Sequence, residues 1–220
     1  MNQKESELGL APTDEASLEQ SAAEAGLPPG IFKDPKSTMT TIEPGYIETY
    51  SGKIISIFDP QPEDIDLEDI AHALAHQCRF NGHVSRIYTI AEHSLLVANL
   101  CPRDQRREGL MHDASEAYVG DLITPLKREL PGFQGIEDRF HALIAEKYNL
   151  EFPHSHAVRL ADLQALWLER RQLRTGSLDS IWPVFESGGF TPPYDLRIPE
   201  FAPAEAKLRF LSQARRYGLS

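Results

Sequence analysis

Residues 89–100 constrain the fold of this chain most, because apolar side chains lie on every side of the helix that they predict. A helix of that kind is buried inside a protein rather than lying on its surface. The segment also contains His93, and a buried imidazole must be hydrogen-bonded or bound to an ion. His93 is therefore either a core histidine satisfied by a neighbour or a ligand.

Apolar periodicity predicts further helices along the chain. They cover residues 66–77, 103–118, 136–148, 156–175 and 204–217. Two short β-prone runs within residues 46–58, joined through Ser51 and Gly52, predict a hairpin. The expected fold class is all-α, a helical bundle with one short β-hairpin near its N-terminal side.

Composition divides the chain into two parts. Residues 1–39 are rich in Ser, Glu, Ala, Pro and Gly without sustained periodicity, so we expect a disordered or loosely attached tail. Residues 40–220 are expected to form one domain. The two cysteines, Cys78 and Cys101, are too few for a disulfide framework, and we expect both to be reduced and buried.

The charge of the chain restricts its partners. A formal net charge of −11 disfavours polymeric nucleic acid, because phosphate backbones require a basic surface. No apolar run is long enough to span a bilayer, so no membrane partner is expected. The absence of a secretory signal favours a cytoplasmic protein.

The dipeptide His112-Asp113 is the second candidate feature. On the helix predicted at residues 103–118, His112, Asp113 and Glu116 lie opposite the apolar arc. Gly109 lies on the same side and leaves room for an approaching group. The polar face of a surface helix would show a similar pattern.

Asp162 is the third candidate feature, since it lies in the apolar stripe of the helix at residues 156–175. A carboxylate there is costly unless a cation meets it. Arg159, three residues earlier, is one candidate cation and a metal ion is the other. Two histidines and two aspartates from three helices suit one divalent transition metal such as Mn, Co, Fe, Ni or Zn, with positions left open.

The order His…His-Asp…Asp on successive helices resembles the HD superfamily of metal-dependent phosphohydrolases. The closer resemblance is to bacterial 5'-deoxynucleotidases and phage deoxynucleotide phosphohydrolases. It covers about residues 46–175, and the matching stretches are residues 69–74, 79–83, 90–94, 110–118 and 160–162. The resemblance implies four metal ligands, which are His93, His112, Asp113 and Asp162.

The resemblance also implies substrate-handling residues. Glu116 would be catalytic, acting on the attacking water or the leaving oxygen. Arg79 would hold phosphate and Phe80 would pack beside the sugar, although the similar deoxynucleotidases usually carry Trp at the position of Phe80. Arg79 is otherwise an exposed charge at a helix end. His83 and Asp121 are weaker substrate-binding candidates, each with an ordinary structural explanation.

The expected function is hydrolysis of the 5'-phosphoester of a small nucleotide or deoxynucleotide, either a monophosphate or a triphosphate. Similar proteins are often homodimers. The alternative is a catalytically quiet HD module that binds a nucleotide or a partner. A two-iron oxygenase of the same fold would need further histidines in residues 116–127, and that stretch contains none.

Overall fold

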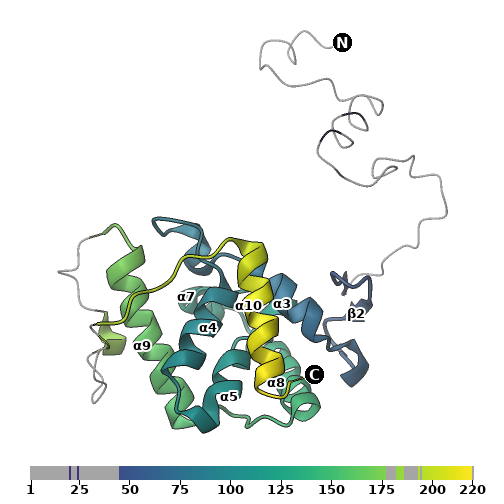
Figure 1. Cartoon of the computed structure of the whole chain (residues 1–220). Coiled ribbons are helices and arrows are strands. Elements are labelled where there is room, and N and C mark those ends of the chain that lie inside the picture. Colours follow the sequence, from purple (N-terminus) through teal and green to yellow (C-terminus); the bar gives the residue numbers. More distant parts are fainter. Residues whose placement is uncertain are drawn as a thin grey trace. The chain divides into compact units, whose positions relative to one another are not determined.

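A computed structural model describes residues 20, 24, 45–176, 182–185, 193 and 195–219. Apart from residues 20 and 24, the tail expected at residues 1–39 lies outside the described residues. Contacts divide the chain into residues 1–42 and residues 43–220, and only the second unit is considered below. That unit is mostly helical and contains a small two-stranded antiparallel sheet (Figure 1).

The predicted helices and strands occur in the expected order, and the structure adds a short helix at residues 124–129 that apolar periodicity did not predict. The helices are α3 (Leu67–His76), α4 (Ile90–Leu100), α5 (Arg106–Met111), α6 (Glu116–Val119), α7 (Thr124–Glu129), α8 (Phe133–Tyr148), α9 (His156–Leu173) and α10 (Pro203–Arg216). Short 3-10 turns cover Pro62–Asp64, Arg79–Gly82, Arg103–Gln105 and Pro183–Phe185. In the predicted hairpin, β1 (Tyr46–Glu48) pairs with β2 (Ile54–Ser56). None of the described helices is long and apolar enough to cross a membrane.

Helix α4 lies at the centre of the unit, as its apolar circumference predicts. It packs against α3, α5, α9 and α10 (Figure 1). Thr89 begins the helix with a capping box, in which its hydroxyl accepts from the backbone N–H of Glu92 and the Glu92 carboxylate accepts from that of Thr89. One apolar cluster joins α4 to α3, α5, α8 and α10, and a second joins it to α9. His93 is therefore completely buried on the helix that the two clusters share.

The helix expected at residues 103–118 is not continuous, and this prediction was wrong. Residues 112–115 form turns, in which Ala114 N–H donates to Met111 O and Glu116 N–H donates to Asp113 O, both at 3.0 Å. These bonds span three residues rather than four, so the chain is wound more tightly than an α-helix. His112 itself keeps helical backbone angles (φ −62°, ψ −34°), so the tightening begins just after α5.

Two local expectations also require correction. A Cβ on Gly109 would lie 2.6 Å from Cys101 Sγ and 3.2 Å from Ala98 Cα, so Gly109 permits close packing of α5 on α4 rather than leaving room for a ligand. Cys101 is buried as expected, but Cys78 is exposed. Cys78 follows the end of α3 in extended backbone, where its side chain leaves the core.

Candidate metal centre

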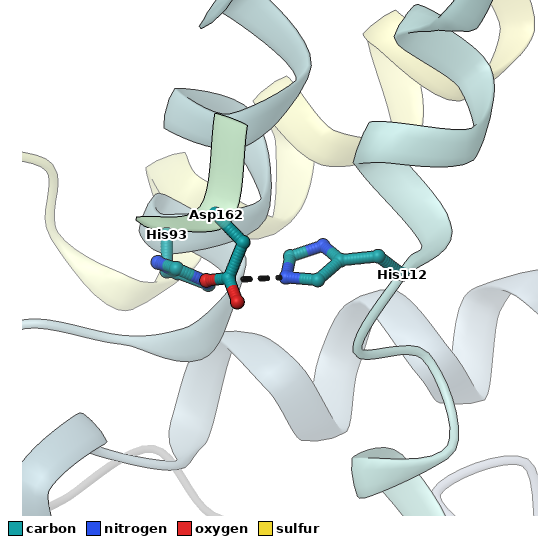
Figure 2. Close-up of side chains that lie close together, drawn as sticks. All are labelled: His93, His112 and Asp162. Atoms are coloured by element: carbon teal, nitrogen blue, oxygen red, sulfur yellow. Dashed lines mark hydrogen bonds and ion pairs between the residues drawn. The ribbon is translucent and has the colours of Figure 1, made fainter. Parts of the chain in front are cut away.

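Four predicted side chains meet at one point. His93 comes from α4, His112 and Asp113 from the turn after α5, and Asp162 from α9. One ligand atom each from His93, His112 and Asp162 lies within 4.8 Å of the other two (Figure 2). His93 Nε2 lies 3.2 Å from His112 Nε2 and 3.2 Å from Asp162 Oδ1. Asp113 Oδ2 lies 3.4 Å and 3.2 Å from the two imidazole Nε2 atoms.

The outer nitrogens of both imidazoles are engaged. His93 Nδ1 lies 2.6 Å from Oε1 of Glu169, and His112 Nδ1 lies 2.9 Å from the carbonyl oxygen of Gly109. Since both partners are acceptors, each Nδ1 donates its proton, and in the neutral form of the two rings each Nε2 has a lone pair that faces the other. Two lone pairs 3.2 Å apart repel unless a cation or a proton lies between them. The cluster could therefore hold a metal ion.

The charge of the cluster suits a divalent ion. Arg79 Nη1 lies 3.4 Å from Asp113 Oδ2, and its Nε lies 3.4 Å from Glu169 Oε1. With Asp162, three carboxylates against one guanidinium leave a formal charge of −2. Burial and Arg79 lower the pKa of His93, but the three carboxylates outweigh them and raise it well above its ordinary value. The site therefore favours added positive charge, which a divalent cation supplies.

Glu169 was missed by the sequence analysis, although it is completely buried in this centre. Its carboxylate accepts from Tyr88 Oη at 2.9 Å and contacts both His93 and Arg79. Burial raises the pKa of Glu169, but the charges of Arg79 and His93 lower it by a larger amount, so the pKa lies below its ordinary value. The carboxylate therefore stays ionised. The sequence did contain one indication of this role, which is the spacing between Glu169 and Asp162. Glu169 follows Asp162 by seven residues, so the two side chains lie two turns apart on the same face of one helix.

Glu116 is buried in α6 beside this centre. Its Oε2 has no hydrogen-bond partner among the described residues, and its Oε1 lies 3.7 Å from Lys127 Nζ. Lys127 is itself held by Glu137 at 2.7 Å. Burial, followed by the charges of Asp113 and Asp121, raises the pKa of Glu116 to about 9. Without a metal ion these surroundings favour the protonated form of the Glu116 carboxyl, and a cation bound by Asp113 would lower its pKa.

The predicted substrate-binding residues differ in their positions. Arg79 is only 12% exposed, so it is not a solvated helix end. Phe80 has a left-handed backbone (φ 55°), and its ring lies 5.3 Å from the guanidinium of Arg79 and 5.7 Å from that of Arg174. Asp121 is half-buried, and burial raises its pKa although Arg79 lowers it. His83 is exposed, and within the described part of the chain no contact joins its ring to the cluster.

Asp162 is more accessible than its apolar stripe predicts. Its side chain is 46% exposed, so the expectation of a buried carboxylate was wrong. Arg159 donates to the backbone carbonyl of His154 and is not the cation that meets Asp162. Asp162 instead contacts His93 and leaves one side of the cluster open to solvent.

The fold and the site define a mostly helical protein with a candidate metal centre. The chain belongs to the family of the uncharacterized protein YfdR of Escherichia coli K12, with which it is 41% identical over 170 residues, covering 76% of this chain and 93% of YfdR. An uncharacterized protein of Rhodobacter capsulatus is 37% identical over 186 residues, covering 74% of this chain and 95% of the relative. No protein-family model matches the chain.

Proposed function

We propose that the chain is an HD-type metal-dependent phosphohydrolase that cleaves the 5'-phosphoester of a small nucleotide or deoxynucleotide. The observation that carries the proposal is the convergence of two imidazole Nε2 atoms and two carboxylate oxygens beside a buried glutamic acid. The resemblance of the motif to HD phosphohydrolases supports the same assignment. A monophosphate is the first choice of substrate, and a triphosphate cut at its first phosphorus is the second.

The donor set indicates the kind of metal. Imidazole nitrogen together with carboxylate oxygen suits Mn, Co, Fe, Ni or Zn better than Mg, which prefers oxygen ligands alone. His93, His112, Asp113 and Asp162 would hold the ion. When bound, it would polarise a phosphoryl oxygen and lower the pKa of a water molecule. The exposed side of Asp162 provides access for both groups.

The surrounding residues have separate tasks in this proposal. Arg79 places the substrate phosphate beside the cluster, since a guanidinium matches phosphate oxygens geometrically. Phe80 packs beside the sugar, held next to Arg79 by its unusual backbone. Glu116, which is buried beside the cluster with no hydrogen-bond partner for Oε2 among the described residues, exchanges a proton with the attacking water or the leaving 5'-oxygen. Asp121 helps to position the substrate in this proposal, and its charge also raises the pKa of Glu116.

The testing experiment is a screen of ribo- and deoxynucleoside mono- and triphosphates with Mn, Co and Mg, with the products identified by mass. We expect a nucleoside with phosphate from a monophosphate, or a nucleoside with triphosphate from a triphosphate. His112→Ala should abolish this turnover, whereas His156→Ala, which alters an exposed histidine on α9, should retain it. If the metal-loaded protein binds a nucleotide and leaves every one intact, the quiet binding module replaces this proposal.

A further inference from the structure

A cavity of about 460 Å³ lies between α4, the segment at residues 103–106 and the C-terminal end of α10. Its volume falls within the range of small-molecule and cofactor sites, about 300–1,000 Å³. Three arginines line it, which are Arg103, Arg106 and Arg216. Hydrogen-bonding side chains from Asn99 and Gln213 also line it. The cavity is therefore large enough for a nucleotide-sized ligand.

The cavity is basic although the chain carries a net charge of −11. No carboxylate lines it within the part of the chain that the structure describes. The described residues give Arg103, Arg106 and Arg216 no ion-pair partner, and Arg106 Nε is buried without a hydrogen-bond acceptor among them. Three full positive charges outweigh the partial negative charge, about −0.5, at the C-terminal end of α10. The lining of the cavity therefore carries a net positive charge, and of its three arginines Arg103 and Arg216 are exposed to solvent and Arg106 is half-buried.

This cavity is separate from the candidate metal centre. Both use α4, but His93 faces α9, whereas Leu95, Ala98 and Asn99 face the cavity beside α10. Figure 1 shows α4 between α9 and α10, so the two sites lie on opposite sides of one helix. None of the four candidate ligands lines the cavity.

We propose that this cavity is a second binding site, which takes a small ligand bearing a phosphate chain. Guanidinium groups bind phosphate oxygens through paired hydrogen bonds, and three arginines match the several charges of a di- or triphosphate. Asn99 and Gln213 provide neutral hydrogen bonds for the remainder of the ligand. The phosphate chain can belong to a nucleotide or to free polyphosphate, and both sources share this chemistry. The proposal does not depend on the activity of the metal centre.

Calorimetric titration of the full-length chain with tripolyphosphate tests the site, in buffer stripped of divalent metal. We expect saturable binding that weakens about tenfold or more in Arg103→Gln/Arg106→Gln/Arg216→Gln, because each charged hydrogen bond contributes strongly. Binding should persist in His112→Ala, in which the metal centre is lost. If dATP binds more tightly than tripolyphosphate and its affinity falls in Arg216→Gln, a nucleotide is the ligand of this cavity, whereas equal affinities would identify the phosphate chain alone.

The matched control is Arg215→Gln, which removes the same charge from an exposed position next to Arg216 on α10. Arg215→Gln should leave the affinity within twofold, while Arg216→Gln alone should weaken it several-fold. Arg216 is exposed, so this single variant decides the question if the triple variant fails to fold. Three results overturn the proposal: absence of binding at millimolar tripolyphosphate, affinity undiminished in Arg216→Gln, or citrate binding as tightly as tripolyphosphate.

Discussion

Nδ1 of His93 lies 2.6 Å from Oε1 of Glu169, and both side chains are completely buried. The carboxylate accepts the Nδ1 proton and leaves Nε2 directed at His112 and Asp162. Glu169 and Asp162 lie two turns apart on α9, so one helix provides both a candidate ligand and the group that orients another ligand. Glu169 is therefore a positioning residue of the candidate metal centre rather than a ligand.

Glu169→Gln tests this positioning role. The amide keeps the shape of the carboxylate but removes its charge, so His93 becomes a weaker donor to a metal ion. Changes to groups that orient metal ligands cost about 10- to 100-fold in metal affinity, and we expect a loss in that range for Mn or Zn. Competition with a coloured chelator measures it.

The control for this variant is Glu146→Gln, an exposed glutamate on α8 that should leave the metal affinity unchanged. The metal-free Glu169→Gln protein should also unfold at lower denaturant concentration, since Arg79 would lose the charge of its completely buried ion-pair partner. Wild-type metal affinity in a folded Glu169→Gln protein would contradict the role assigned to the His93–Glu169 pair.

Glu116→Gln is expected to separate catalysis from metal binding. If Glu116 delivers a proton to the leaving oxygen, its loss should lower kcat by about 10² to 10⁴. The metal content should stay at the wild-type level, because within the described part of the chain Glu116 meets the cluster through a backbone hydrogen bond to Asp113 and not through its side chain. Steady-state kinetics and elemental analysis of one preparation measure both quantities. Turnover near the wild-type rate would remove Glu116 from the proposed mechanism.

Gly109→Ala should destabilise the protein. Its Cβ would lie 2.6 Å from Cys101 Sγ and 3.2 Å from the backbone of Ala98, so α5 must move away from α4. Overpacking of this kind costs about 1–3 kcal/mol. His112 Nδ1 donates to the Gly109 carbonyl, so the same shift should also weaken metal binding.

Gly135→Ala is the matched control for that substitution. Gly135 lies within α8, and a Cβ there meets no atom within 4 Å. The variant should gain about 0.5–1 kcal/mol, because alanine loses less backbone freedom than glycine in a helix. Denaturant unfolding of both variants measures the opposite signs. If both substitutions changed the free energy of unfolding equally, helix propensity rather than packing would determine the effect of alanine at residue 109.

Local pattern was sufficient to predict parts of this architecture. The apolar circumference of residues 89–100 predicted a buried central helix, and α4 is that helix. The break at residues 112–115 was not predicted, because periodicity assumes an unbroken helix. Glu169 was missed since its burial depends on Arg79 and Tyr88, which lie at least 81 residues away in the sequence. The basic cavity likewise contains residues from α4 and α10, which are far apart in the sequence, and no local sequence pattern predicts that they lie side by side.

His141 should make the protein sensitive to acid. Its ring stacks on Phe152 with centroids 5.3 Å apart, meets His154 edge-on at 5.2 Å, and lies 2.9 Å from Ser115 Oγ. Burial, followed by the charge of His154, lowers the pKa of His141 to about 4. Asp113 and Asp138 raise that pKa, and His112 lowers it further, but burial prevails.

The direction of the effect follows from proton binding. At a pH well above 6.5 the imidazole is neutral in both the folded and the unfolded state, and its contribution to stability is fully present. Between pH 6.5 and about 4 the unfolded chain binds a proton that the folded chain does not, so the free energy of unfolding falls by up to about 1.4 kcal/mol per pH unit. His141→Gln should reduce this slope, and His156→Gln, at an exposed position, should not. Urea unfolding of metal-free protein from pH 7.5 to 4.5 measures the slopes, and an identical slope in His141→Gln and wild type would assign the acid sensitivity to other groups.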